Sequence, residues 1–395
     1  MKEKIKREAN SIFKTVVAFR RDLHKNPELA YKEKRTAMVI ARTLRSLGLA
    51  VQTGVAKTGV IGILRGKRSS PVVALRADMD ALPIGEESRV PYRSEIPGVM
   101  HACGHDVHMS NVMGAAMILS QMRNVLEGTV KFVFEPSEER NPGGAIGMLK
   151  EGALDDVDAI FGLHVYPRAE TGKLGFRTGP TMAAADELSI TIRGKGGHGA
   201  RPQSAVDPVV VASEVVLALQ TVVSRSLNPF QPVVLTIGKI EGGTAQNVIP
   251  DEVRLEGTLR TVDSHTRKRA HELVRRKVAG VCAAAGAKFK LVISKGNPPL
   301  VNQPTETEFA RARAVEFRGI RNVFEVEQVM GGESFAYFLE KIPGTFFRLG
   351  VANKRKGIVH EVHTPLFDVD EQAMKTGAGF FAYLAYEYLR KNPVR

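Results

Sequence analysis

Five short clusters of residues with metal-binding side chains are spread along the chain. They are Arg76–Asp80, His101–His108, Phe134–Glu139, Gly162–His164 and Val362–Pro365. Together they supply thiolate, imidazole and carboxylate donors, which suit borderline-soft divalent cations, zinc first. We therefore expect a site for two divalent ions, with zinc as the first choice and manganese, cobalt or nickel as alternatives.

The cluster His101–His108 is the most specific of the five. It places three histidines and Cys103 within eight residues, although a buried or redox-active cysteine beside histidines gives the same pattern. A lone histidine such as His164 is more often a core residue than a ligand. Adjacent glutamates such as Glu138 and Glu139 are more often solvated, but this pair follows an apolar strand and Pro136, where a solvated helix face is less expected.

Two neighbouring cations would suit these clusters to the hydrolysis of an amide. Such ions polarise the scissile carbonyl and lower the pKa of a bound water. A nearby carboxylate then accepts the water proton and passes it to the leaving amine. Adjacent glutamates can divide this work, with one as a ligand and its neighbour as the base.

The elements that must position these clusters alternate between strands and helices. Apolar runs at Val72–Met79, Val130–Glu135 and Ala159–Val165 predict buried strands. Helical patterns cover Glu33–Leu47, the segment after His108, a short run from Gly143 to about Leu154, and Glu371–Leu389. This alternation predicts an α/β fold whose chemistry lies at the strand ends.

The pattern changes near Asp186. Strands are predicted at Leu188–Arg193, Val233–Ile240, Val253–Val262 and Phe289–Ser294, with helices at Val206–Leu227 and Asp263–Ala285. The order βαββαβ is that of a ferredoxin-like domain. We therefore predict two domains: residues 1–186 with 297–395 as the larger, metal-binding one, and residues 187–296 inserted into it.

The composition argues against a nucleic-acid-binding protein and against a membrane protein. The chain has 395 residues and a net charge of +14, yet aromatic residues are 6% and Trp is absent. A nucleic-acid binder more often shows a dense basic stripe with interleaved aromatics, so the charge favours solubility or the attraction of anionic substrates. No unbroken apolar run reaches about 18 residues, so no membrane span is expected.

The compartment is predicted from the N-terminus and the cysteines. The first residues are charged and lack the apolar core of a secretory signal. Cys103 and Cys282 are the only cysteines, and two cysteines give no disulfide framework. A reducing cytoplasm is the expected location.

Ordered motifs over nearly the whole chain make it similar to a known family. It resembles the zinc-dependent aminoacylase/carboxypeptidase amidohydrolases, in the branch of hippurate hydrolases, bacterial aminoacylases and plant auxin-conjugate hydrolases. The motifs that carry the resemblance are Arg21–Leu29, Leu75–Pro83, Met100–His108, Glu135–Glu139 with Gly143–Ala145, Gly194–Pro202, Gly242–Pro250 and His363–Pro365.

The resemblance implies roles for residues of the larger domain. The implied metal ligands are Cys103, His105, Glu139, His164 and His363, with the Cys103 thiolate in the bridging place. It implies that Glu138 is the general base and that Asp80 lies near the base or a ligand imidazole. Asp78 stays ambiguous, because related branches have a histidine ligand there.

The resemblance also gives roles to the inserted domain. It implies a homodimer formed through this domain, in which His198 crosses the interface and stabilises the oxyanion in the partner's site. Asn247 would contact the substrate, and Arg260 would bind its carboxylate.

The implied reaction is hydrolysis of an N-acyl-amino acid to a carboxylic acid and an amino acid. A metallocarboxypeptidase that acts on short or blocked peptides is the alternative within the class. A non-catalytic binding protein on the same fold is the alternative from another class.

The chain departs from the family pattern near the site. Val107 and Met109 replace smaller residues after the His105-Asp106 pair, and we expect them to narrow the pocket. Glu135 stands where Gln is common, and we expect it to add negative charge near the metals.

Overall fold

The computed structural model describes residues 1–141 and 143–391. The chain forms two compact units: Met1–Gly179 with Asn302–Glu327 and Tyr337–Arg395, and Pro180–Val301 with Gln328–Ala336. The second unit is therefore wider than the 187–296 range expected from the sequence. The reason is that flanking segments bond to the start of its first strand: Ala185 N–H donates to Asn297 (3.1 Å) and Ala183 N–H to Gly331 (2.9 Å).

The first unit is built on an eight-stranded sheet in the order β1-β2-β4-β3-β5-β16-β6-β15. Its centre, β4-β3-β5-β16, is parallel, which brings the carboxyl ends of neighbouring strands to one edge. The edge strand β1 and its neighbour β2 were not predicted from the sequence. The strands are β1 (Ala50–Val55), β2 (Gly59–Arg65), β3 (Val72–Asp78), β4 (Thr129–Glu135), β5 (Ala159–Glu170), β6 (Leu174–Phe176), β15 (Val323–Glu325) and β16 (Gly344–Ala352).

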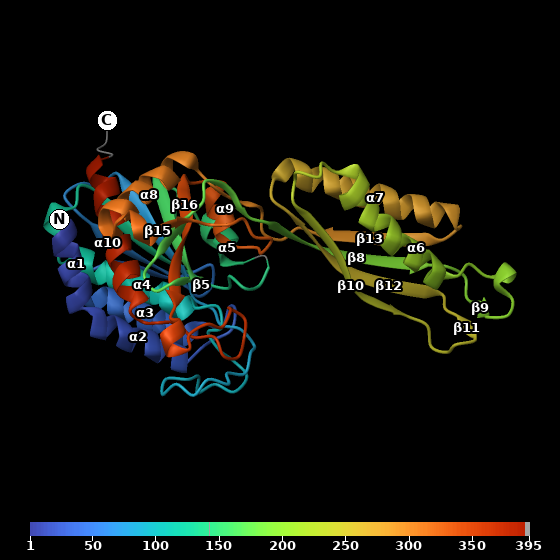
Figure 1. Ribbon diagram of the computed structural model, residues 1–395, viewed down its shortest axis with the longest axis horizontal. Helices are drawn as coiled ribbons and strands as arrows, with labels where there is room; N and C mark the ends of the chain where they lie inside the picture. Colours follow the sequence, from blue (N-terminus) through green and yellow to red (C-terminus); the bar gives the residue numbers. More distant parts are fainter. Residues whose placement is uncertain (142, 392–395) are drawn as a thin grey trace. The chain divides into compact units, whose positions relative to one another are not determined.

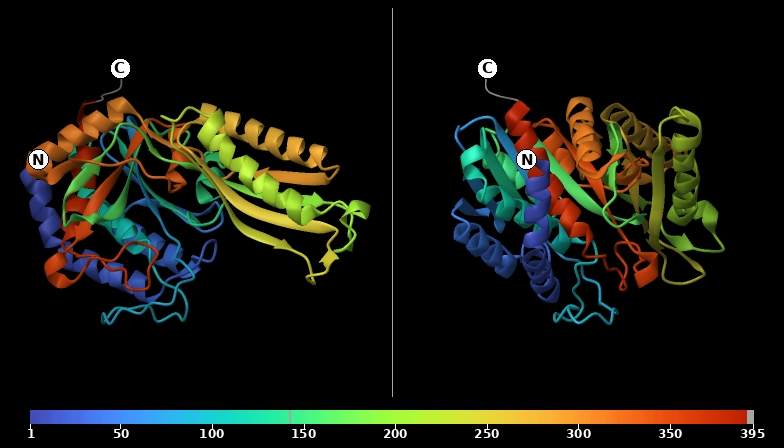
Figure 2. Two further views of the ribbon diagram at one scale, coloured as in Figure 1. Left: turned by 45° about the vertical axis from the view of Figure 1, so that its right-hand side comes forward. Right: turned by 60° about the vertical axis from the view of Figure 1, so that its left-hand side comes forward.

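Helices cover this sheet, and α4 and α10 pack together against β3 (Figures 1 and 2). Aromatic rings fill the space between strand and helix: Phe347 lies 5.2 Å from Phe380 between ring centroids. The helices of this unit are α1 (Lys2–Ser11), α2 (Phe13–Lys25), α3 (Lys34–Ser46), α4 (His105–Ser120), α5 (Gly144–Lys150), α8 (Pro304–Arg318) and α10 (Ala373–Lys391). Near the junctions between the units lie β7 (Gly179–Met182), β14 (Leu300–Asn302) and α9 (Phe335–Leu339).

Helix α4 begins at His105, whereas the sequence pattern predicts a helix only after His108. Gly104 precedes it with φ 81°, and a Cβ there would lie 2.7 Å from a methyl of Val165. A glycine therefore suits both the left-handed turn and the close approach of β5. The helix is buried on all sides, with only its last residue, Ser120, outside the buried set, so it is a core element rather than a surface helix.

The second unit has a four-stranded antiparallel sheet in the order β10-β12-β8-β13. Helices α6 and α7 supply the apolar side chains that complete its core. The chain order is the βαββαβ that the sequence predicts. Its elements are β8 (Ala184–Arg193), β9 (Gly197–His198), α6 (Pro208–Thr221), β10 (Val233–Gly242), β11 (Val248–Ile249), β12 (Glu252–Thr261), α7 (Ser264–Ala284) and β13 (Lys288–Ser294).

Helix α6 differs from the prediction at its end, because its last turn, Val222–Ser226, is a π-helix. By length and composition alone, Pro208–Ser226 could cross a membrane, and 28% of that window is buried. The sequence predicts no membrane span here, because the polar residues Ser213, Glu214 and Gln220 interrupt the apolar run of this helix. Apolar side chains of α6 nevertheless remain exposed: Val209 (44%), Val210 (54%) and Leu217 (70%).

Candidate active site

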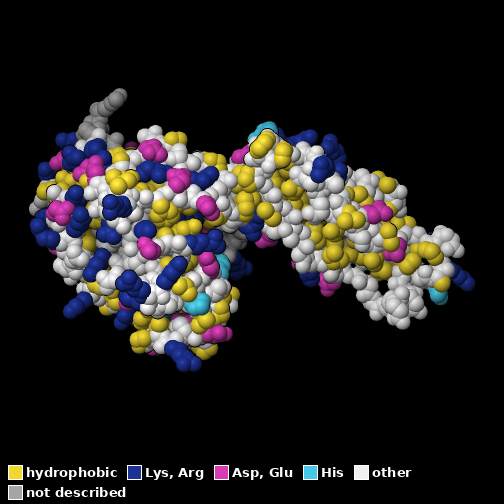
Figure 3. All heavy atoms as spheres, viewed as in Figure 1, with side chains coloured by type: hydrophobic (Ala, Val, Ile, Leu, Met, Phe, Trp, Pro, Cys, Tyr) yellow, Lys and Arg dark blue, Asp and Glu magenta, His cyan; other side chains and the backbone are white. Residues whose placement is uncertain are grey.

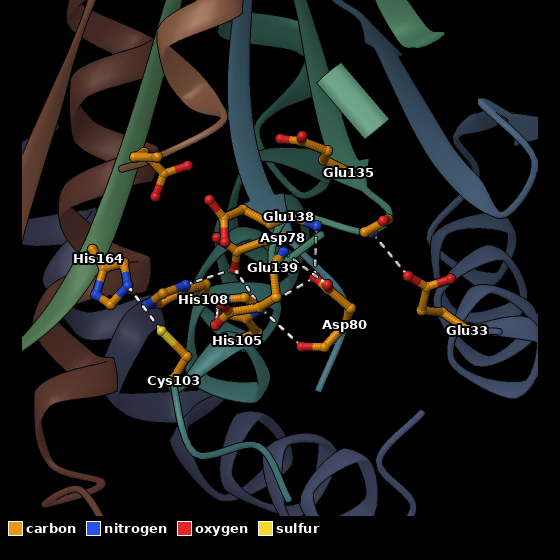
Figure 4. A network of polar contacts seen from close by, with 12 residues as sticks. Glu33, Asp78, Asp80, Cys103, His105, His108, Glu135, Glu138, Glu139 and His164 are labelled. Atoms are coloured by element: carbon orange, nitrogen blue, oxygen red, sulfur yellow. Dashed lines mark hydrogen bonds and ion pairs between the residues drawn. The ribbon is translucent and has the colours of Figure 1, made fainter. Parts of the chain in front are cut away.

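Four of the five predicted clusters meet where β3 and β4 end, at the start of α4 and at His164 within β5 (Figure 4). His363 joins them from the loop before α10. Two triplets of residues each offer donor atoms that lie within 4.8 Å of one another. One triplet is Cys103, His105 and His164, and the other is Cys103, Glu139 and His363. Cys103 belongs to both triplets. The five residues expected as ligands are thus in one place, with the thiol between two sets of donors.

The hydrogen bonds of two histidines leave one ring nitrogen of each facing this centre. His105 Nδ1 donates to the carbonyl of Asp80 (2.8 Å), and its buried Nε2 has no hydrogen-bond partner. His164 Nδ1 donates to the carbonyl of Val165 (2.8 Å), and its Nε2 lies 3.3 Å from Cys103 Sγ. A backbone partner on Nδ1 fixes the tautomer that offers Nε2 to a metal.

The second triplet lies on the more open side of the site. His363 Nε2 is 3.2 Å from Cys103 Sγ and 3.3 Å from Glu139 Oε1, and its side chain is half exposed. Glu139 Oε1 is buried and has no hydrogen-bond partner. A buried carboxylate oxygen and an imidazole nitrogen that both lie beside the same thiol fit the donor set of a divalent cation.

Burial and mutual charge set the protonation of this cluster without metal. Burial, together with Glu139, raises the pKa of the Cys103 thiol well above its ordinary value. Burial opposes ionisation of Glu139, but His363 and His105 lower the pKa of its carboxyl overall. Burial also lowers the pKa of His164, and His108 adds to the effect, so His164 is a neutral imidazole, the form that binds metals.

The loop Pro136–Glu139 carries both expected glutamates. The carboxylate of Asp80 accepts the N–H of Glu138 (2.9 Å) and of Glu139 (3.0 Å). Because the carbonyl of Asp80 also accepts from His105, Asp80 lies beside both the expected base and a ligand imidazole. Glu138, Glu139 and His105 each offer an atom within 4.8 Å of the others. The Glu138 carboxylate therefore lies beside the donor atoms of Glu139 and His105.

Asp78 and His108 also form a possible donor group with His105, but their atoms are already engaged. His108 Nδ1 donates to Asp78 (2.7 Å), and its Nε2 accepts the N–H of Val165 (3.0 Å). Asp78 pairs with buried Arg76 (2.8 Å). The structure therefore places Asp78 beside His105 and His108, in an ion pair with Arg76.

Two expectations about the pocket are wrong. Val107 and Met109 are fully buried and belong to the hydrophobic core of the first unit, so their side chains do not line an open pocket. Glu135 does not add free charge near the metals, because its carboxylate pairs with Arg76 (2.7 Å) and accepts the N–H of Ala145 (2.8 Å).

The three remaining predicted residues lie in the second unit. His198 is exposed on β9, and its Nδ1 accepts the N–H of Ala200 (3.1 Å), which leaves the proton on Nε2. Asn247 is exposed, and its carbonyl accepts the N–H of Gly199 (2.8 Å). Arg260 donates to Thr258 (3.0 Å), and no carboxylate among the described residues pairs with its guanidinium.

Sequence reasoning missed the part played by Glu33 and His108. Glu33 accepts the N–H of Ser137 (2.8 Å) at the loop of the two glutamates. An acidic residue at the start of a helix is common, so nothing in the sequence sets Glu33 apart. His108 stood out by its motif, but only the fold shows that both of its ring nitrogens are used.

The comparisons with known proteins agree with this geometry. The chain matches the peptidase family M20/M25/M40 over residues 74–387. It is 38% identical over 392 residues to thermostable carboxypeptidase 2 of Saccharolobus solfataricus, covering 98% of this chain and 99% of that protein. It is 40% identical over 379 residues to N-acetylcysteine deacetylase of Bacillus subtilis, covering 95% and 98%.

A solved structure gives the same result. A Bacillus subtilis protein described as a dinuclear metal-binding peptidase of the M20 family matches with a TM-score of 0.85 and 36% identity, covering 96% of this chain and 99% of that one. The resemblance inferred from the motifs is thereby confirmed. The chain belongs to peptidase family M20/M25/M40.

Proposed function

We propose that this protein is a metal-dependent amidohydrolase that cleaves the amide bond of N-acyl-amino acids. The observation that carries the proposal is the position of Cys103 between two triplets of donor atoms, with Glu138 beside the ligand Glu139. Relatives of nearly full length are named as a deacetylase of an N-acylated amino acid and as a carboxypeptidase, and both reactions hydrolyse an amide.

Two divalent ions fit the donor set, and we propose zinc. Cys103, His105 and His164 would hold one ion, and Cys103, Glu139 and His363 the other. Thiolate and imidazole donors favour zinc over the harder magnesium and calcium. When bound, such ions supply Lewis-acid polarisation of the scissile carbonyl and activation of water.

Within the chain, we assign proton transfer to Glu138. Its carboxylate would accept a proton from the attacking water and deliver it to the leaving nitrogen. Asp80 binds the backbone of Glu138 and Glu139 and the ring of His105, so it would orient base and ligands together rather than touch the substrate.

We propose that the second unit supplies the substrate side of the site. His198 has its proton on Nε2 and could donate it to the developing oxyanion. Arg260 lacks an acidic partner among the residues described, and a substrate carboxylate would provide one. Asn247 lies on the segment that pairs with His198, where its amide could contact the acyl group.

We further propose that two chains pair through the second unit, so that His198 serves the partner's site. Support comes from the exposed apolar residues of α6 and from exposed Ile240 (60%) on edge strand β10. Apolar side chains gather over the sheet of this unit (Figure 3). A surface of this kind is typical of an interface.

A metallocarboxypeptidase is the second candidate, because a peptide that ends in a free carboxylate presents the same bond to the same groups. The name of the Saccharolobus relative favours it. The two candidates differ in the acyl side, where a carboxypeptidase must accept a peptide chain and an aminoacylase a small acyl group.

The deciding experiment is turnover of a substrate panel after chelation and again after zinc, manganese or cobalt is restored. The panel holds hippurate, several N-acetyl-amino acids and blocked dipeptides. Metal-restored release of the amino acid is the expected result, and the preferred substrates separate the two candidates. A folded protein that holds two ions per chain and cleaves none of these compounds would contradict the proposal.

A further inference from the structure

The loop that carries Glu138 and Glu139 is held by its backbone as well as by its side chains. Three consecutive amides, those of residues 137, 138 and 139, donate to two buried carboxylates. Glu33 accepts the first at 2.8 Å, and the two oxygens of Asp80 accept the second and third at 2.9 and 3.0 Å. Figure 4 shows Glu33 and Asp80 on either side of this segment.

Glu33 reaches this loop from the residue that precedes α3, far away in sequence. Its side chain is fully buried, and its carboxylate accepts hydrogen bonds from three groups. Oε1 accepts the N–H of Tyr31 (2.9 Å) as well as that of Ser137, and Oε2 accepts the hydroxyl of Thr58 (2.7 Å). A buried carboxylate that receives three hydrogen bonds is fixed in direction as well as in place.

The two backbone donors to Oε1 have the same unusual conformation. Ser137 has φ 56° and Tyr31 has φ 59°, a region that residues other than glycine rarely adopt. Such conformations persist when the surrounding contacts hold them. Glu33 supplies that contact at Ser137, and a relaxed Ser137 would turn the next peptide and with it the side chain of Glu138.

We propose that Glu33 is a positioning residue for the reaction: it holds Ser137 in the left-handed conformation that aims Glu138 at the metal centre. This inference rests on the proposed function, in which Glu138 is the base. Asp80 fixes the two peptides that follow, so Glu33 and Asp80 together hold the whole turn. Glu33 itself touches neither the ligand atoms nor the substrate side of the site.

The test compares Glu33→Ala with Glu33→Gln. The alanine variant removes the hydrogen bond to Ser137. We expect kcat to fall by about 10–100-fold, the range for groups that orient metal-site residues. KM should stay within about twofold of the parent value, because substrate binding is left intact. The glutamine variant can accept both N–H groups with its amide oxygen and donate to the Thr58 hydroxyl. We expect it to restore most of the lost kcat.

Glu28→Ala is the matched control. The Glu28 carboxylate accepts the N–H groups of Arg35 (3.1 Å) and Thr36 (2.8 Å) in the same segment, but it has no contact with residues 136–139. It should lower the stability of α3 and leave kcat unchanged. Thr58→Val removes one partner of Glu33 and should reduce kcat less than Glu33→Ala does.

Amide hydrogen exchange of residues 137–139 gives a readout that does not depend on turnover. We expect faster exchange in Glu33→Ala than in the parent or in Glu28→Ala, in protein that still binds two ions per chain. A folded Glu33→Ala variant with parent kcat and parent exchange would overturn the inference, and so would an equal loss of kcat in Glu28→Ala. If the parent cleaves no panel substrate, the proposed function fails, and exchange alone decides the role of Glu33.

Discussion

At the scale of single residues, the site depends on backbone groups that decide which atom of each side chain is free. The carbonyls of Asp80 and Val165 accept hydrogen bonds from Nδ1 of His105 and His164, so each ring offers Nε2 to the centre. His108 has the same residue type and lies in the same motif. Both of its nitrogens are bonded, so it supports β5 instead of binding a metal.

Glu138→Ala tests the division of work between the two glutamates. We expect kcat to fall by about 10²–10⁴-fold, the range for removal of a general base, while the protein still binds two ions per chain. Steady-state kinetics and elemental analysis of the same preparation measure both. Loss of one ion would instead make Glu138 a ligand, and parent turnover would rule out its role as base.

At the scale of elements, close packing of two helices positions His105, one of the proposed metal ligands. Helix α4 carries His105 at its first residue and crosses α10 where small residues meet: a Cβ on Gly114 would lie 2.7 Å from the Cβ of Ala378. Neither backbone can move away easily, because both helices are buried. The position of His105 therefore depends on a contact more than one helical turn away.

Gly114→Ala should lower the free energy of unfolding by about 1–3 kcal/mol, the cost of overpacking a core. Gly280→Ala is the control, since Gly280 lies in α7 with no atom within 4 Å of its added Cβ. That variant should gain up to about 1 kcal/mol from helix propensity. Urea unfolding measures both, and a neutral Gly114→Ala would show that α4 and α10 can separate without cost.

In the second unit, one buried carboxylate joins a strand to a helix. Asp186 on β8 accepts from Arg267 (2.9 Å) and contacts His271 (2.5 Å), both on α7. Burial opposes its ionisation, but His271 and Arg267 lower the pKa of Asp186 overall. A lowered pKa means that the charged form stabilises the folded state.

Asp186→Asn should therefore lower the free energy of unfolding by about 1–3 kcal/mol near neutral pH. The contribution of Asp186 is complete above the pKa of an unfolded aspartate, about 3.9, and is lost as the pH falls through the lower folded-state value. The difference between parent and variant should thus shrink as the pH falls below about 4. A difference that does not shrink in acid before the protein unfolds would contradict this assignment.

At the scale of the whole molecule, bound metal should stabilise the first unit and not the second. Ions that bind the folded state alone add about 2.7 kcal/mol at a free concentration 100 times Kd. Chelation should lower the Tm of the transition that includes the first unit, and restored zinc should raise it again. Calorimetry measures this, and an unchanged Tm would show that the centre does not bind zinc.

Mixed dimers test whether each site draws on two chains. Combining His198→Ala and Glu138→Ala chains should create one intact site in each mixed dimer, and random pairing should restore about a quarter of the parent activity. Each variant alone should stay nearly inactive. No recovery in a verified mixed dimer would place His198 in its own chain's site or outside the reaction.

The charge of the molecule is also a property of the whole. Lys and Arg side chains are spread over the visible face of the first unit rather than gathered in one stripe (Figure 3). The absence of a nucleic-acid partner remains a prediction from composition. The compartment of the protein remains a prediction from its charged N-terminus and its two cysteines.

The sequence by itself determined the fold class, the family and the strand ends where the donors would lie. Apolar runs and donor types are local properties, and they identify Cys103, His105 and Glu139 as candidates without any knowledge of contacts. The start of the helix predicted at Asp263–Ala285 is also a local property: the Asp263 carboxylate caps α7 by accepting the N–H of Thr266 (2.7 Å).

Only the tertiary structure decided which atoms are free and which are engaged. The charge of Glu135 is neutralised by Arg76, Val107 and Met109 face the core, and Glu33 supports a loop about a hundred residues later. Each of these outcomes depends on a partner that is distant in sequence and close in space. Such pairings follow from packing the sheet and its helices, so no local pattern of residue types could have predicted them.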